Sequence, residues 1–365
     1  MTNYDTTSVP QYTVDPFWPK PLPNNWILGQ CSGIAVDPTN DHVWVTHRPG
    51  SLTQREAGQV QNPPWADCCT PAPPVLEFDP AGELVRAWGG AKDGVLWPRS
   101  EHGIYVDHDG NVWCGSMDEI VIKSRPDGTR LLTLGERSPP APPPTGPRPD
   151  PSPTGAIRRA PGASNDLTKF AAPTDIAVDI DARETYVSDG YGNRRIIVVD
   201  SETGAYKRHW GAYGEKPDDG PMPDYVANET PARSFRSPVH AVRIGNDGLV
   251  YVADRPNNRI QVFRKSGAFV KEVFLATWTL AMGSVWDIEF SPDANQTFVF
   301  IPDGTNCKVW ILKRDDLSVV GTFGRGGRMA GQFEWVHNIA ADSQGTLYTS
   351  EVNTGKRVQK FVRRA

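Results

Sequence analysis

Residues 237–263 read SPVHAVRIGNDGLVYVADRPNNRIQVF, and this segment shows the repeating unit of the chain most clearly. Apolar residues alternate in HAVRI and again in LVYVAD, which is the two-residue period of a β-strand. The intervening GNDG is typical of a tight hairpin turn. A third strand, RIQVF, follows, and GAFVKEV at 267–273 predicts a fourth. The unit therefore predicts a four-stranded antiparallel sheet, the content of one propeller blade.

The same unit returns five more times along the chain. The other copies are residues 33–48, 103–117, 175–200, 287–312 and 338–362. Six copies predict an all-β fold, a six-bladed β-propeller that occupies residues 1–365 as a single domain. Residues 1–30 are then an N-terminal extension, and surface insertions are expected at about 49–75, 138–161 and 212–236. The Pro-rich 138–161 could also link two domains, but repeats continue on both sides of it, which favours an extended surface loop.

Composition agrees with many short strands and argues against several kinds of partner. Thirty-four Gly, 34 Pro and 12 Trp among 365 residues favour turns and pleated strands over helices. The net charge of −5, with both signs interspersed, offers no basic surface for nucleic acid and no cationic face for a membrane. No stretch is apolar enough to span a bilayer and the N-terminus lacks signal-peptide features, so a cytoplasmic protein is expected. The oligomeric state stays open.

The cysteines form an odd and sparse set without C-x-x-C spacing, and they are Cys31, Cys68, Cys69, Cys114 and Cys307. Neither a disulfide framework nor a thiolate zinc site is expected from such a set. The adjacent Cys68 and Cys69 could form a redox pair, but two free thiols in a Pro-rich loop is the favoured interpretation. A reducing compartment fits this usage best.

Histidines recur in one register of the repeat. The residues immediately before the first strand of each copy are, in order, Ser32, His102, Thr174, His240, Trp286 and His337. Alternate blades of a six-bladed ring are about 120° apart, so three imidazoles are expected to converge on the central axis. Three neutral imidazoles with an open fourth position form a catalytic zinc site. The alternative is that each His only bonds to a neighbouring blade.

The other four histidines, His42, His47, His108 and His209, break that register and are expected on the surface. Two more residues are predicted to face the same mouth: Arg48, which ends VWVTHR, and Tyr191, in SDGYGNRR. An Arg offers a rigid fork for a substrate carboxylate, and a Tyr beside a metal and an Arg can act as a base. For Arg48 the alternative is an interblade salt bridge. Arg255 is a weaker candidate of the same kind, since Asp-Arg pairs often tie blades together.

These residues resemble a known family, the NHL-repeat propeller of peptidyl-α-hydroxyglycine α-amidating lyase. The segments that carry the resemblance are THRPG (46–50), EHGIYVDHDGNVW (101–113), PTDIAVDIDARETYVSDGYGNRRI (173–196), the segment 237–263 and, more loosely, FEWVHNIAADSQGTLY (333–348). The resemblance extends from about residue 30 to 362, outside the insertions. It implies a lyase that releases glyoxylate and a C-terminal amide from a hydroxyglycine-extended peptide.

The resemblance also implies roles for single residues. His102, His240 and His337 match the family's zinc ligands, and Arg48 and Tyr191 match its catalytic Arg and Tyr. A structural calcium is implied on the backbone carbonyls of Ile34 and Ile104 and on the residue after the third His, here Asn338.

The chain departs from the family at three of these positions. Asn338 replaces a carboxylate, and an amide oxygen brings no charge to calcium. Trp335 replaces a pocket Met, and Gly192 replaces the Cys that follows the catalytic Tyr. The substrate pocket, in which Arg48, Arg255 and Trp335 are the expected contacts, and the disulfides are therefore expected to differ.

Three functions stay open at this point. The first is a zinc-dependent lyase acting on a carbinolamide in a small molecule or short peptide. The second is a zinc hydrolase or hydratase that uses the same three His on a different small molecule. The third is a non-catalytic NHL-type binding propeller, which would hold no zinc. Gluconolactonase-type propellers bind calcium through carboxylates, whereas the residues in phase here are imidazoles.

Overall fold

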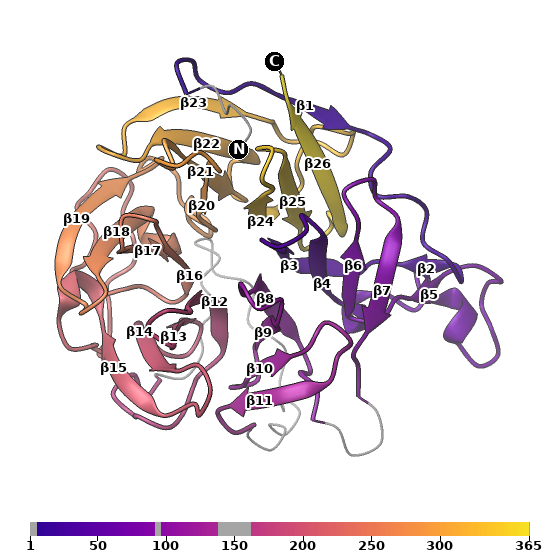
Figure 1. Cartoon of the computed structure of the whole chain (residues 1–365), viewed down its shortest axis with the longest axis horizontal. Helices are drawn as coiled ribbons and strands as arrows, with labels where there is room; N and C mark the ends of the chain where they lie inside the picture. Colours follow the sequence, from indigo (N-terminus) through magenta and orange to yellow (C-terminus); the bar gives the residue numbers. More distant parts are fainter. Residues whose placement is uncertain (1–5, 92–95, 138–161, 365) are drawn as a thin grey trace.

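The computed structural model describes residues 6–91, 96–137 and 162–364, and most of its strands form six four-stranded sheets arranged in a ring (Figure 1). The innermost strands are β3 (Gln30–Val36), β8 (Glu101–Val106), β12 (Pro173–Asp179), β16 (Val239–Ile244), β20 (Glu289–Phe290) and β24 (Val336–Ala341). The second strands are β4 (Val43–Arg48), β9 (Val112–Ser116), β13 (Glu184–Asp189), β17 (Leu249–Asp254), β21 (Phe298–Asp303) and β25 (Leu347–Glu351).

The third strands are β6 (Val75–Phe78), β10 (Val121–Ser124), β14 (Arg195–Asp200), β18 (Arg259–Arg264), β22 (Lys308–Lys313) and β26 (Arg357–Arg363). The outermost strands are β7 (Leu84–Trp88), β11 (Arg130–Leu134), β15 (Tyr206–Trp210), β19 (Phe269–Phe274), β23 (Val319–Phe323) and β1 (Tyr12–Asp15). Each sheet is antiparallel and in this order from the inside outward. The predicted all-β, six-bladed propeller is therefore confirmed.

The ring is closed by the two ends of the chain. β1 pairs antiparallel with β26, with Tyr12 opposite Arg363, and so supplies the outermost strand of the sixth blade (Figure 1). Tyr12 packs between Phe300 and Phe323 of the fifth blade, at centroid distances of 5.8 and 5.0 Å. Part of the expected N-terminal extension, residues 1–30, is thus a blade strand.

The core lies between neighbouring blades. Since side chains alternate across a strand, each sheet presents one apolar face to the blade before it and one to the blade after it. Between the third and fourth blades, for example, Tyr186 and Val198 pack against Val242, Val252 and Phe263, all buried. Because no blade can bury both of its faces alone, the ring must close to complete the core.

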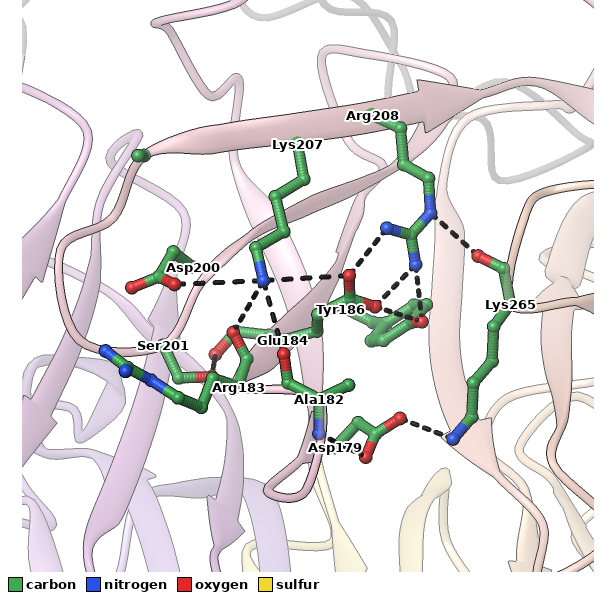
Figure 2. A network of polar contacts seen from close by, with 12 residues as sticks. Asp179, Ala182, Arg183, Glu184, Tyr186, Asp200, Ser201, Lys207, Arg208 and Lys265 are labelled. Atoms are coloured by element: carbon green, nitrogen blue, oxygen red, sulfur yellow. Dashed lines mark hydrogen bonds and ion pairs between the residues drawn. The ribbon is translucent and has the colours of Figure 1, made fainter.

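Polar contacts tie the outer strands of the third blade to the fourth, as Figure 2 shows. Arg208 on β15 donates to both carboxylate oxygens of Glu184 on β13, at 2.7 and 2.5 Å. Its Nε donates to the Lys265 carbonyl oxygen at 2.7 Å, beyond the end of β18. The Lys265 ammonium forms an ion pair with Asp179 at the end of β12.

The long connections lie at one end of the ring, which we call the entry face: the end at which the innermost strands begin. Residues 49–74 connect β4 to β6 there, and they contain η1 (Pro49–Ser51), η2 (Gly58–Val60) and β5 (Thr70–Pro71), which pairs with β2 (Trp26–Ile27). Residues 211–238, which include η3 (Ala212–Gly214), connect β15 to β16 at the same face. η4 (Arg255–Asn257) follows β17 there. The expected insertion 138–161 lies outside the described residues.

Two expectations from the sequence are wrong. His47 is completely buried in β4, where its ring nitrogens pair with the Gly29 amide and the Pro73 carbonyl at 3.0 Å each, so it is not a surface residue. Cys68 and Cys69 are joined as a vicinal disulfide rather than held as two thiols. Among the described residues, no helix combines the length and apolar character needed to cross a membrane.

Candidate metal centre

Three histidines from alternate blades meet on the axis of the ring. His102, His240 and His337 lie near the starts of β8, β16 and β24, and their ring centroids are 4.7 to 5.1 Å apart. Each is at most 2% exposed. One nitrogen from each ring lies within 4.8 Å of the other two, and this is the one group of metal-ligating side chains found within the described part of the chain. The three His could therefore hold a metal ion.

Hydrogen bonds fix the orientation of each ring. Nδ1 of His102 lies 2.7 Å from the Thr174 carbonyl oxygen, and Nδ1 of His240 contacts the Trp286 carbonyl oxygen. A carbonyl oxygen can only accept, so Nδ1 carries the proton and Nε2 keeps its lone pair. Partners of this kind are typical of metal-ligating histidines. Nε2 of His240 is buried and has no hydrogen-bond partner. Because buried polar atoms are normally paired, this nitrogen is available to bind a ligand such as a metal ion.

His337 has two such partners, the backbone of Ser32 and the side chain of Asn338. Its Nδ1 contacts Oδ1 of Asn338, while Nδ2 of Asn338 donates to Asp287 at 3.0 Å. Because the amide nitrogen is committed to Asp287, the amide oxygen faces the imidazole and accepts its proton. Nδ1 therefore carries the proton in all three rings, and each Nε2 keeps its lone pair.

Burial keeps the three imidazoles neutral. It lowers the pKa of His337 to about 3, helped by the positive charge of Arg48. It also places the pKa values of His102 and His240 well below the ordinary value, assisted by the neighbouring imidazole of His337 and by the charges of Arg48 and Arg255. Neutral imidazole is the form that ligates zinc.

Tyr191 reaches the centre because glycines flank it. The turn after β13 brings Gly190 against the Val239 backbone, where an added Cβ would lie 1.9 Å from the carbonyl oxygen. At Gly192 an added Cβ would lie 2.6 Å from the Cβ of Ala171. The sequence Gly-Tyr-Gly thus allows the close packing that presents Tyr191, with its hydroxyl 3.3 Å from Nε2 of His102.

Arg255 approaches the same hydroxyl from the fourth blade. Its Nη1 lies 3.4 Å from the Tyr191 oxygen, and its guanidinium stacks on Trp286 at 4.2 Å from the ring centroid. The expected interblade Asp-Arg pair does not involve it, because Asp254 pairs with Arg259 instead. Arg255 is 2% exposed and its Nε has no partner, so the geometry favours it as a ligand-binding residue.

Arg48 is held beside the centre by neutral partners. Its Nε donates to the Glu101 carbonyl oxygen at 2.7 Å and its Nη1 to Gln30 Oε1 at 2.9 Å. Within the described residues no carboxylate pairs with Arg48 or Arg255, so the alternative of an interblade salt bridge finds no support. Two guanidinium groups without counter-ions make the site attractive to an anion.

An aromatic wall lines one side of the centre. Trp286 lies between His240 and His337, at 5.6 Å from each ring centroid, and Trp335 lies 5.9 Å from Trp286. Trp335 has a φ of 61°, a left-handed conformation that is unfavourable for a large side chain. Trp286 was visible in the histidine register but was given no role from sequence alone.

Of the residues expected to bind calcium, Asn338 makes other hydrogen bonds. Asn338 contacts His337 and Asp287 through its amide, as described above, and Ile34 and Ile104 are buried, 1% exposed, on the facing strands β3 and β8. The amide oxygen that would face calcium is already occupied by an imidazole. Calcium at these residues stays a prediction that the contacts of Asn338 do not support.

Comparison with known proteins agrees with this architecture. The NHL repeat family matches residues 239–263. Peptidyl-glycine alpha-amidating monooxygenase B of Xenopus laevis is 28% identical over 360 residues, covering 92% of this chain. The chain spans 34% of that relative's length. NHL repeat-containing protein 3 of Homo sapiens is 26% identical over 372 residues, covering 96% of this chain and 84% of the relative.

Solved structures show the same fold. Virginiamycin B lyase from Staphylococcus aureus has a TM-score of 0.53 at 13% identity and covers 96% of this chain and 99% of its own. A streptogramin B lyase has a TM-score of 0.51, also at 13% identity, and covers 97% and 98%.

Fold and site together define a six-bladed propeller that has three histidines on its axis and one segment that matches the NHL repeat. The resemblance to the propeller of the amidating enzymes is confirmed, since these relatives match over nearly the whole of this chain.

Proposed function

We propose that the protein is a zinc-dependent lyase that cleaves the C–N bond of an α-hydroxyglycine-like carbinolamide into an amide and an aldehyde such as glyoxylate. One observation carries the proposal: three buried imidazoles whose Nε2 atoms keep their lone pairs lie beside a tyrosine hydroxyl and two guanidinium groups that lack counter-ions. The likeness to amidating enzymes supports the substrate class.

Arg48 and Arg255 are the proposed carboxylate-binding residues. A glyoxylate-forming substrate carries its carboxylate on the carbon that bears the hydroxyl. Both guanidinium groups lie close enough to the centre for their charges to lower the pKa of His337. A planar guanidinium can bind a carboxylate through two hydrogen bonds and so orient the adjacent hydroxyl toward the axis.

Tyr191 is the proposed base. A zinc ion on the three His would supply Lewis acidity toward the substrate hydroxyl. Acting as the base, Tyr191 takes the hydroxyl proton, the electron pair of the O–H bond forms the carbonyl as the C–N bond breaks, and Tyr191 returns that proton to the departing amide nitrogen. Nη1 of Arg255 lies 3.4 Å from the Tyr191 oxygen and donates a hydrogen bond to it, which positions that oxygen for the transfer.

The direct test is incubation of the zinc-loaded protein with an N-acyl-α-hydroxyglycine and measurement of glyoxylate and of the primary amide. We expect both products in equal amounts, and neither above background with the Tyr191→Phe variant. Zinc-loaded protein that releases no glyoxylate would exclude this substrate class but leave the metal site standing.

A zinc hydrolase or hydratase is the second candidate. The specific observation in its favour is the pair Trp286 and Trp335, which gives the pocket a wall unlike the Met expected from the resemblance. Lactones, esters and hydroxylated amides screened against wild type and His240→Ala would separate the two reactions.

A non-catalytic binding propeller is the third candidate, supported by the likeness to NHL repeat-containing protein 3, whose name states no activity. It predicts protein without zinc and without turnover. A small-molecule or short-peptide ligand, rather than nucleic acid or membrane, is proposed from the acidic charge balance. The cytoplasmic location stays a prediction.

A further inference from the structure

A second layer of polar residues lies one position beyond the register that contains the three histidines. Asp175, Asp287 and Asn338 each follow the register position of the third, fifth and sixth blades. They are buried to the same degree, with exposures of 1%, 0% and 2%. Two buried carboxylates in one ring repel each other and lose their hydration, so they require a positive partner.

The chain supplies that partner from the fourth blade. Arg243 on β16 is 8% exposed and places its guanidinium between the two carboxylates. Its Nη1 donates to Oδ2 of Asp175, and its Nη2 lies 3.3 Å from Oδ1 of Asp287. Burial alone would lower the pKa of Arg243, but the charges of Asp175 and Asp287 raise it above the ordinary value, so the guanidinium stays charged.

The same cluster continues to the metal centre. Oδ2 of Asp287 accepts from Nδ2 of Asn338 at 3.0 Å and from the Ile339 amide at 3.1 Å. Asn338 in turn accepts the Nδ1 proton of His337. An unbroken series of polar contacts therefore links Asp175, Arg243, Asp287 and Asn338 to one imidazole of the centre.

Arg243 also lines a cavity of about 700 Å³ at the end of the propeller opposite the entry face. The cavity is bordered by the last residues of the innermost strands, such as Val36, Val106 and Ile244. Removal of the Arg243 side chain would therefore open the two carboxylates to the ions that enter this cavity.

We propose that the Arg243 guanidinium is a built-in cation that takes the place of a second, structural metal ion in the ring, so that the protein needs zinc at one site and no calcium. The proposal does not depend on the lyase reaction. It also explains why the residue after the third His can be an uncharged Asn: the ring already contains its counter-charge.

The first test uses the unaltered protein. Calcium and zinc are measured after dialysis from calcium-containing into calcium-free buffer, and the melting temperature is measured in both buffers with zinc present and no soluble chelator. We expect no retained calcium and the same melting temperature in both buffers. Stoichiometric calcium, or a melting temperature that falls in the calcium-free buffer, would overturn the proposal, while the zinc count reports separately on the metal centre.

The second test removes the cation. Arg243→Ala leaves Asp175 and Asp287 uncompensated, and we expect its melting temperature in calcium-free, zinc-containing buffer to fall by about 5 °C or more and to recover in part when calcium is added. Arg243→Lys keeps the positive charge. We expect it to fold and to have the same melting temperature with and without calcium, and this result can be obtained even if the alanine variant cannot be purified.

The matched control is Lys265→Ala. It removes a cation that lines the same cavity but forms its ion pair with Asp179, which is not part of the layer of Asp175, Asp287 and Asn338. We expect this variant to be indifferent to calcium. An Arg243→Ala protein that keeps the wild-type melting temperature and shows no response to calcium would contradict the proposal, as would an Arg243→Lys protein that requires calcium.

Discussion

The three histidines take their common orientation from acceptors on neighbouring residues. Thr174 and Trp286 offer backbone carbonyls to His102 and His240. His337 has a backbone hydrogen bond with Ser32 and also contacts the side chain of Asn338, so its orientation is the one that a substitution of a neighbouring side chain can alter. Its two partners in the ring, Asn338 and Asp287, act on the centre as positioning residues.

Tyr191→Phe tests the proposed base at the residue scale. The variant loses only the hydroxyl, so we expect kcat on an N-acyl-α-hydroxyglycine to fall about 10²- to 10⁴-fold, the usual contribution of general acid–base catalysis. Zinc content and melting temperature should stay at wild-type values, because the ring still packs against His102. Wild-type turnover by this variant would assign the proton transfer elsewhere.

Arg255→Ala tests the proposed carboxylate contact. Loss of a hydrogen bond to a charged group is worth about 1.5–3 kcal/mol, so kcat/KM should fall roughly 10- to 100-fold for a substrate with a free carboxylate. The matched comparison is the same substrate as its methyl ester, for which the variant and wild type should differ little. Equal losses on acid and ester would show that Arg255 acts by packing on Trp286 alone.

Single residues could be placed from the sequence where their position in the repeat alone determines where they lie. His102, His240 and His337 could be predicted to meet because they share one position in alternate blades. His47 could not be placed correctly, because a His near the end of a strand is buried or exposed according to which connection covers it. Here the Gly29 amide and the Pro73 carbonyl oxygen pair with the two ring nitrogens of His47. The Pro74 carbonyl oxygen accepts from the backbone amide of His47.

Single strands decide how the ring closes and how its outer rim is held. β1 is separated from its partner β26 by nearly the whole chain, so no local pattern in residues 1–30 indicates the pairing. The inner hairpins, in contrast, were predictable because both strands and their turn occur within one short stretch.

Tyr12→Ala tests the closing strand. Tyr12 is 9% exposed and packs on two aromatic rings of the fifth blade. Truncation of a buried aromatic side chain costs about 3–5 kcal/mol, so the melting temperature should fall by several degrees. Phe17→Ala, which alters a side chain that is 78% exposed, is the control and should melt like wild type.

Glu184→Gln tests the rim network drawn in Figure 2. Hydrogen bonds from Arg208 lower the pKa of Glu184 from 4.5 to about 2, although partial burial opposes them. The ionised group therefore stabilises the fold at pH values above its unfolded pKa, and this contribution is lost as the pH falls from about 4.5 toward 2. After allowance for solvent screening we expect a loss of about 1 kcal/mol in the variant at pH 7.

The difference between this variant and wild type should shrink as the pH is lowered through that range, as measured by denaturant unfolding. Glu202→Gln is the control, because Glu202 is 57% exposed in its ion pair with Lys123. If the difference in unfolding free energy between Glu184→Gln and wild type stays constant from pH 7 down to about 2, the stabilising role of ionised Glu184 is contradicted.

At the scale of the whole molecule, the ring turns sequence registers into layers of side chains. One layer contains the histidines, and the next contains Asp175, Asp287 and Asn338 with Arg243 between the two carboxylates. The first layer could be predicted because metal-ligating residue types stand out against apolar strands. The second could not, because an Arg in VHAVRI gives no sign that it turns inward; that follows only from the curvature of the closed ring.

The central claim is that this ring holds one zinc ion on three imidazoles. Metal analysis of the purified protein, repeated on His102→Ala with circular dichroism to verify folding, tests it most directly. We expect about one zinc per chain in the wild type and a small fraction of that in the folded variant, since one of three ligands is lost. Native protein that contains no zinc, or a His102→Ala protein that retains the full amount, would contradict the account.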